Sequence, residues 1–149
     1  MPLEPPPRDE LGNSQPHDHV GIAADDGINR RVSEQQIVAD GKTGQRRLSS
    51  MVFKTSSGPN GGMSVDLERS IIEAGIDPKG YVTTPRWMGS IRFLAGALRD
   101  EQMQVGFNPL PDNPHHGEVW GEISRSKVRQ LRRICEWFVP IANTAISDE

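Results

Sequence analysis

The sequence predicts an α+β fold, with a small mixed sheet of about four strands, three helices and a disordered N-terminal tail. Apolar residues alternate with polar ones in some segments and recur every three or four residues in others, so both strands and helices are expected. The 149 residues correspond to one domain, and an apolar content of 34% is enough to build one core. Pro- and Gly-rich stretches separate these segments and mark the turns.

Residues 1–27 differ in composition from the rest of the chain. They hold five of the 12 prolines and six acidic residues, against Arg8 as their only basic residue. Such a stretch buries too little apolar surface to offset the entropy lost when it becomes ordered. We therefore predict a disordered acidic tail over residues 1–27 and a single α+β domain over residues 28–149.

The domain is predicted to begin with a β-hairpin. Residues 28–38 and 45–55 show the apolar and polar mixture of strands, and Asp40-Gly41-Lys42-Thr43-Gly44 between them is a turn with two glycines. The Gly-, Pro- and Ser-rich residues 56–62 form a loop.

Two helices are predicted next. The first begins at Ser64 as its N-cap and ends near Gly75, with Leu67, Ile71 and Ile72 on its apolar side. The second begins at Thr84-Pro85, because proline suits the first position of a helix. Its apolar face consists of residues spaced by three and four positions: Trp87, Ile91, Leu94, Ala95 and Leu98.

The remaining elements are two strands and a last helix. Val105 and Phe107 alternate on a short strand, and a further strand covers residues 117–123. Ser124 caps the last helix, whose apolar face is formed by Val128, Leu131, Cys135 and Phe138.

The proline loop, residues 108–118, carries the densest group of polar side chains. Its three prolines restrict the backbone and can hold side chains in defined positions at low entropic cost. One of its histidines could act as a general base oriented by Asp112 or Glu118. A metal site of both imidazoles and a carboxylate, or histidines that simply face water, are the alternatives. Adjacent residues of an extended chain point to opposite sides, which disfavours the metal site.

Other motifs are assigned no site. His17-Asp18-His19 falls in the predicted tail, where nothing holds its geometry. The loop before Ser64 is not a phosphate-binding P-loop, because Met63 stands where the motif requires lysine. One cysteine, Cys135, can form neither an internal disulfide nor a cysteine-based zinc site.

Charge and hydropathy exclude further classes of protein. The net charge of −3 is unlike that of a dedicated duplex-binding protein, so nucleic acid is not an expected partner. We expect no membrane span and no signal peptide, and hence a cytoplasmic protein. The last helix carries four arginines that we interpret as a solvated surface: Arg125, Arg129, Arg132 and Arg133. The alternatives are contact with an acidic protein partner or, less favoured, electrostatic contact with nucleic acid.

Several segments resemble a group of small bacterial proteins. The similarity covers residues 30–32, 49–53, 63–66, 81–85 and 109–121, the last of which contains the string PLPDNPHHGEVWG. The resemblance implies a bacterial origin and no particular activity.

A second resemblance is to ADP-ribosyltransferases, in the order Arg31, Ser49-Ser50 and Glu118. It implies that NAD is used, with Arg31 holding the phosphates, Ser50 bracing the nicotinamide pocket and Glu118 stabilising the oxocarbenium-like centre through a ribose hydroxyl. The serine motif lacks its usual middle threonine, and His116 stands where a second acid often precedes the glutamate.

Our leading hypothesis is a domain that binds another protein through the proline loop and the following strand, with no cofactor or metal. Asp112, His115 and Trp120 are the expected contact residues, because aromatic and polar groups on a stiff loop lose little entropy on docking. The alternative is an NAD-using ADP-ribosyltransferase or glycohydrolase. Its expected catalytic residues are Arg31, Ser50, His116 and Glu118.

Overall fold

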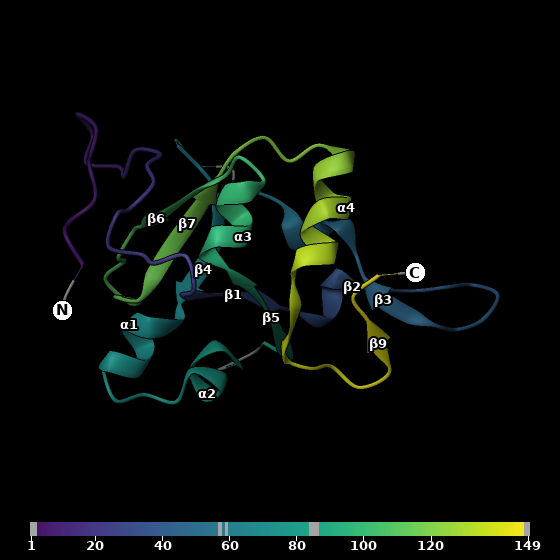
Figure 1. Cartoon of the computed structure of the whole chain (residues 1–149). Coiled ribbons are helices and arrows are strands. Elements are labelled where there is room, and N and C mark those ends of the chain that lie inside the picture. Colours follow the sequence, from purple (N-terminus) through teal and green to yellow (C-terminus); the bar gives the residue numbers. More distant parts are fainter. Residues whose placement is uncertain (1–2, 57, 59, 84–86, 148–149) are drawn as a thin grey trace.

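Six strands form an antiparallel sheet in the computed structural model, in the order β6-β7-β4-β1-β5-β8 (Figure 1). The structure describes residues 3–56, 58, 60–83 and 87–147. The strands of this main sheet are β1 (Gly27–Val32), β4 (Met63–Leu67), β5 (Gly89–Leu94), β6 (Gln104–Phe107), β7 (His116–Trp120) and β8 (Glu136–Val139).

A smaller sheet contains β2 (Ile37–Ala39), β3 (Arg46–Leu48) and β9 (Thr144–Ala145), with β3 and β9 parallel. The turn between β2 and β3 is the predicted one, and the Asp40 amide donates to the Gln45 carbonyl at 2.8 Å. The hairpin is shorter than predicted, because β1 pairs in the main sheet and a 3-10 helix (Glu34–Gln36) separates it from β2. Another 3-10 helix (Ser50–Phe53) follows β3.

The described residues also form four α-helices, so the α+β class is confirmed while the predicted numbers of strands and helices are too low. None of these helices is long and apolar enough to cross a bilayer. Figure 1 shows two of them in front of the main sheet and two below it. They are α1 (Glu68–Glu73), α2 (Pro78–Thr83), α3 (Ala95–Asp100) and α4 (Arg125–Ile134).

The core lies on one face of the main sheet, beneath α3 and α4. Period-two alternation places most apolar residues of the strands on this face and most polar residues on the other. In β4, for example, Met63, Val65 and Leu67 are buried in the core, whereas Ser64 and Asp66 point to the opposite face. The helices close the core with Leu98 and Leu131.

The helix predicted over residues 64–75 is partly wrong. Ser64 is in the middle of β4 and pairs with Glu118, and the helix α1 begins only at Glu68. The apolar residues that suggested one long helix cross a junction where a strand runs directly into a helix. The predicted end is correct, because Gly75 follows α1 with a φ of +77°, a conformation that glycine adopts without steric cost.

A similar junction overturns the second predicted helix. Ile91 and Phe93 alternate on β5, and α3 begins at Ala95. Thr84 and Pro85, the predicted start, lie outside the described residues.

The last helix begins as predicted and ends early. The Ser124 hydroxyl accepts from the Lys127 amide at 3.2 Å, which is the expected N-cap. Cys135 is already extended, and Phe138 lies in β8, where the chain pairs with β5 instead of continuing the helix.

The N-terminal segment, residues 3–26, lies along β6, the edge of the main sheet, as the purple trace of Figure 1 shows. The His19 amide donates to the Val105 carbonyl at 2.9 Å, and Asp18 accepts from the Val105 amide at 3.0 Å. Ile22 is buried in the core. The segment therefore covers an edge strand that would otherwise expose unpaired backbone groups. The prediction of a disordered tail over residues 1–27 did not include these contacts.

Candidate active site

A row of polar side chains crosses the face of the main sheet that is opposite the core. The row contains one residue from each of five neighbouring strands, held opposite one another by the strand register. In order from β7 to β8 its members are His116, Asp66, Asn29, Arg92 and Glu136. Polar residues in the interior strands of a sheet need a partner or a function, because burying them unpaired costs free energy.

A second polar row lies beside the first and is interrupted in its middle. Ser64 of β4 pairs with Glu118 of β7, and Arg31 of β1 pairs with Ser90 of β5. The pairing of β1 with β4 ends at Asn29, so no ladder bonds connect the strand positions of Arg31 and Ser64. The two strands separate at this point of the sheet.

The half-buried guanidinium of Arg30 supports this separation from the core side. It donates to the carbonyls of Val52 at 2.8 Å and Ser64 at 2.7 Å, and to Lys54 at 3.4 Å. Burial lowers the pKa of Arg30 to about 10, which still leaves it charged at neutral pH. Arg30 thus ties the segment after β3 to the place where β1 and β4 diverge.

Asp66 is the centre of the polar network on the open face. Its carboxylate accepts from Arg31 Nε at 2.8 Å and Nη2 at 3.3 Å, and from Asn113 Nδ2 at 2.9 Å. The Tyr81 hydroxyl donates to Asn113 Oδ1, and the Arg31 guanidinium lies 5.4 Å from the centre of the Tyr81 ring. This bidentate pair and the stacked ring fix the direction of Arg31.

His115 joins this network to α1. Its Nδ1 is 2.7 Å from the Ser70 hydroxyl, and its ring meets the Tyr81 ring edge-on at 5.3 Å. Burial lowers the pKa of His115, against the opposite effect of Asp66, and burial raises the pKa of Tyr81. Both rings therefore favour their neutral forms.

Glu118 is a nearly buried carboxylate with 8% of its surface exposed. Burial raises the pKa of Glu118, although hydrogen bonds from the Gly62 amide and Asn108 and the nearby His116 act in the opposite direction. The residue lines a cavity of about 530 Å³ together with the proline loop and residues 8–14. Glu118 is thus desolvated and still borders a space that a ligand could enter.

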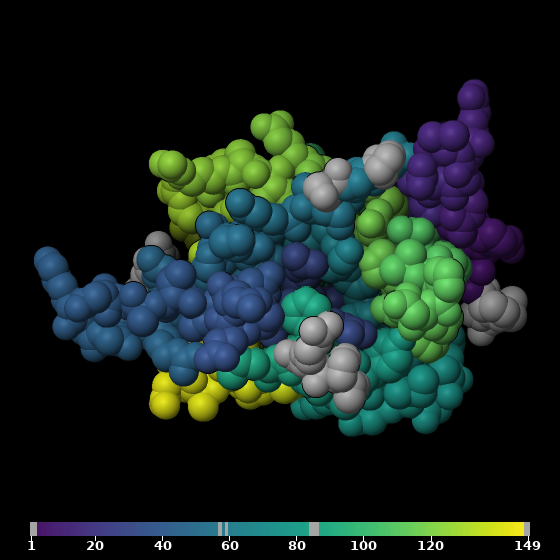
Figure 2. All heavy atoms as spheres, turned by 180° about the vertical axis from the view of Figure 1, so that it is seen from behind, coloured from purple at the N-terminus to yellow at the C-terminus, as the bar shows by residue number. Residues whose placement is uncertain are grey.

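Figure 2 looks onto this face of the molecule. The dark blue atoms of the early chain lie recessed between the blue segment that follows them and the green segment near residue 110. The green segment that includes the proline loop therefore borders this recess.

Asn29 has no protein partner among the described residues. Its side chain is fully buried between Asp66 and Arg92 in the first polar row, yet neither its amide nitrogen nor its oxygen makes a hydrogen bond. An unpaired buried amide lowers the free energy of unfolding. A native structure that keeps such a group needs a reason for it, such as a role in function.

The structure brings three of the four residues predicted for catalysis to the same face and sets one apart. Arg31 and Glu118 both lie on the open face, in the interrupted row. His116 also lies there, two positions before Glu118, with Nδ1 2.7 Å from the Asn108 carbonyl. Ser50 begins the 3-10 helix after β3 and lines a different cavity, with Arg47 and Arg129. The predicted convergence of Arg31, Ser50 and Glu118 therefore fails at Ser50.

The serine that lies between Arg31 and Glu118 is Ser64 of β4, which the sequence pattern predicted to be a helix N-cap. The alternation of Met63, Val65 and Leu67 was the available signal, since it has the period of a strand. Asp66, another residue of the site that was missed, also alternates with apolar residues on β4. Asn29 was missed as well, and it gives a weaker signal because Arg30 follows it on β1.

The residues predicted to contact a partner are mostly buried. Trp120 is 5% exposed, its indole Nε1 donates to the Asn60 carbonyl at 2.6 Å, and His17 packs 5.1 Å from its ring. His115 is 8% exposed, and only Asp112 faces solvent. The partner-binding hypothesis therefore loses Trp120, its main contact residue, because that side chain fills the space beneath the N-terminal segment.

Neither His17 nor Cys135 is a good candidate for a catalytic residue. His17 accepts from the Phe107 amide at 3.1 Å and so supports the edge of the sheet. Burial raises the pKa of Cys135 to about 12, which disfavours a nucleophilic thiolate. Among the described residues, no three His, Cys, Asp or Glu side chains are grouped so that they could hold a metal ion.

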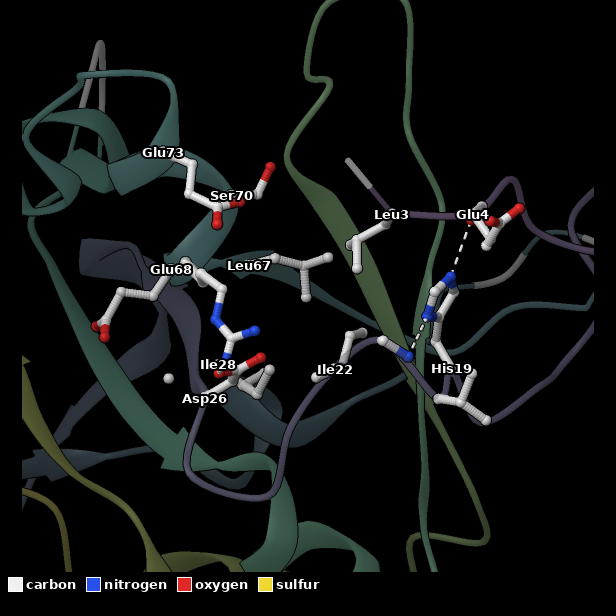
Figure 3. Close-up of a pocket in the computed structure, with 14 residues that line it drawn as sticks. Leu3, Glu4, His19, Ile22, Asp26, Ile28, Leu67, Glu68, Ser70 and Glu73 are labelled. Carbon is white, nitrogen blue, oxygen red and sulfur yellow. Dashed lines mark hydrogen bonds and ion pairs between the residues drawn. The ribbon is translucent and has the colours of Figure 1, made fainter. Parts of the chain in front are cut away.

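A separate cavity of about 310 Å³ lies between the N-terminal segment and α1 (Figure 3). Leu3, Ile22 and Leu67 give it an apolar lining, and several carboxylates surround it. Two of these carboxylates already have cationic partners: Glu68 binds Arg92 at 3.0 Å, and Asp26 binds Arg69. The cavity thus offers an apolar space with much of its charge already neutralised.

Comparison of the chain with protein-family models, with curated proteins and with solved structures gave no match.

Proposed function

We propose that this protein is an NAD-using enzyme, an ADP-ribosyltransferase or an NAD glycohydrolase, whose site is the interrupted polar row of the main sheet. The observation that carries the proposal is the placement of Arg31, Ser64 and Glu118 on three neighbouring strands and on one face. These are the three residue types of the transferase resemblance, with Ser64 in the role first given to Ser50.

Arg31 would hold the diphosphate of NAD. A guanidinium matches the geometry of phosphate oxygens, and its rigid fork is most effective when its direction is fixed in advance. Asp66 provides that fixation here through two hydrogen bonds.

Ser64 and Glu118 would bind the nicotinamide ribose portion. Their strand positions are directly opposite each other, so both side chains leave the sheet at the same place. A Glu118 carboxylate can accept a hydrogen bond from a ribose hydroxyl and so stabilise positive charge that develops at the anomeric carbon.

The reaction breaks the bond between that carbon and the nicotinamide nitrogen, and the electron pair leaves with nicotinamide. Water, or an acceptor group on a second substrate, then gives an electron pair to the carbon and loses a proton. The desolvated surroundings of Glu118 strengthen its effect on the charged transition state, because electrostatic interactions are larger where water is excluded.

The test is release of nicotinamide from NAD, measured by liquid chromatography with and without a bacterial lysate as a source of acceptors. We expect Glu118→Gln to lower the rate by about 10²–10³-fold, the usual effect of removing one group that stabilises transition-state charge. Glu122→Gln is the matched control, because Glu122 is exposed just beyond the same strand.

Ser64→Ala and Ser50→Ala distinguish the two serines. We expect the first to slow nicotinamide release and the second to leave it unchanged. A wild-type protein that releases no nicotinamide under either condition, or a Glu118→Gln variant as active as wild type, would overturn the proposal.

A further inference from the structure

Four arginines line one cavity on the side of the molecule away from the proposed active site. The cavity has a volume of about 550 Å³ and lies between the small sheet and α4, next to the 3-10 helix Ser50–Phe53. Its described lining contains no acidic residue and consists of Val38, Ala39, Arg47, Ser49, Ser50, Arg129, Arg132, Arg133 and Ser147.

Two different elements bring these arginines together. Arg129, Arg132 and Arg133 are spaced by three and four positions on α4, so they share one side of the helix. Arg47 approaches from β3 of the small sheet. The sequence pattern alone suggested a solvated helix surface, and the fourth arginine is added only by the fold.

Arg132 is rigidly held. Its Nη1 donates to the carbonyls of Leu48 at 2.9 Å and Ile146 at 2.6 Å, and its guanidinium stacks 5.4 Å from the centre of the Phe53 ring. A guanidinium fixed in this way loses little entropy when it binds a ligand.

Arg129 and Arg133 are exposed and make no ion pair with any carboxylate in the described part of the chain. Arginine cannot lose its proton at physiological pH, so the repulsion among these charges cannot be relieved by titration. A bound anion relieves it. Ser50 lines the same space, and its hydroxyl can add a hydrogen bond to such an anion.

We propose that this cavity binds a phosphate-bearing ligand of nucleotide size. Planar, multiply hydrogen-bonded recognition of phosphate is the interaction for which arginine is best suited. The volume is in the range of small-molecule sites, which is enough for a mononucleotide or the phosphorylated end of an oligonucleotide. The inference is independent of the NAD activity proposed above, because it uses other residues.

Isothermal titration calorimetry with ADP tests the site, and adenosine serves as the ligand without phosphate. We expect ADP to bind and adenosine not to bind. The double variant Arg129→Gln/Arg133→Gln should weaken ADP binding by at least tenfold, and circular dichroism verifies that it is folded. Arg125→Gln is the control for loss of positive charge on the same helix, because Arg125 lies on α4 and does not line the cavity.

ADP could also enter the proposed active site. The double variant Arg31→Gln/Glu118→Gln, which alters only the proposed active site, distinguishes binding there from binding in the arginine-lined cavity. ADP binding that survives these changes and is lost in the Arg129/Arg133 variant supports the cavity. A 5′-phosphorylated single-stranded RNA hexamer and its 5′-hydroxyl counterpart then distinguish a nucleic-acid end from a free nucleotide. The proposal is overturned if neither ADP nor the phosphorylated hexamer binds, or if Arg125→Gln weakens binding as much as the double variant.

Discussion

Replacement of Asn29 by leucine is predicted to stabilise the protein. Asn29 is fully buried in β1, and neither polar atom of its side chain has a protein hydrogen-bond partner. Leaving a buried amide unpaired costs about 1–3 kcal/mol, whereas a leucine of similar shape carries no such penalty. We therefore expect the free energy of unfolding to rise by about 1–3 kcal/mol in Asn29→Leu.

The measurement is urea unfolding at pH 7, followed by tryptophan fluorescence, together with the thermal midpoint. A gain of 1 kcal/mol corresponds to a rise of about 4 °C in a protein of this size. Asn113→Leu is the contrasting variant, because Asn113 lies in the same polar network and its amide binds Asp66 and Tyr81. Asn113→Leu should lose stability. If Asn29→Leu is destabilised to the same extent, the Asn29 amide is hydrogen-bonded after all, and the reasoning is refuted.

Two further predictions concern Glu118 and Trp120. The pKa of Glu118 is raised above its ordinary value of 4.5, so the folded state binds this proton more tightly than the unfolded state does. The proton therefore stabilises the folded state at low pH, and this contribution to stability is lost as the pH rises through the raised pKa. Urea unfolding between pH 4.5 and 8 should show Glu118→Gln gaining stability relative to wild type as pH rises, and a difference that does not change with pH contradicts this. Trp120→Phe should cost about 1–2 kcal/mol, because the hydrogen bond to the Asn60 carbonyl is lost and a small cavity remains. Trp87→Phe, at a side chain that is 36% exposed, should be nearly neutral in the same assay, and equal effects of the two changes would show that Trp120 is not a core residue.

Local patterns predicted the elements whose signals lie entirely within one segment. The cap of Ser124 and the turn after Asp40 depend on residues a few positions apart, and both were found where expected. The short strand around Val105 and the end of α1 before Gly75 were also predicted correctly. For Ser124 and Asp40, the side chain that determines the structure accepts a hydrogen bond from a backbone amide two or three positions along the chain.

Local patterns failed where a strand passes directly into a helix. At Leu67 and again at Leu94 the apolar residues of the strand and of the helix continue one another, and the combined spacing resembles a single helix. Pairing with distant strands decides in favour of the strand, because each backbone group gains a ladder bond that the sequence window does not contain.

The candidate site was predicted only in part, because local patterns do not show which strands pair. Arg31 and Glu118 were chosen by residue type and chain order, and both lie on the open face of the sheet. Ser64 was missed because its segment was assigned to a helix, and Trp120 was expected to be exposed because nothing in its neighbourhood shows that residues 3–26 cover it.

The sequence by itself determined the α+β class, the turns and caps, and the residue types from which a site could be made. The tertiary structure alone decided which of those residues meet. Ser64 and Glu118 become neighbours through strand pairing, and the four arginines of the second cavity are assembled from β3 and α4. Such contacts join positions far apart in the chain, and they form because burying one shared core face fixes the strand order and register, which no local pattern encodes.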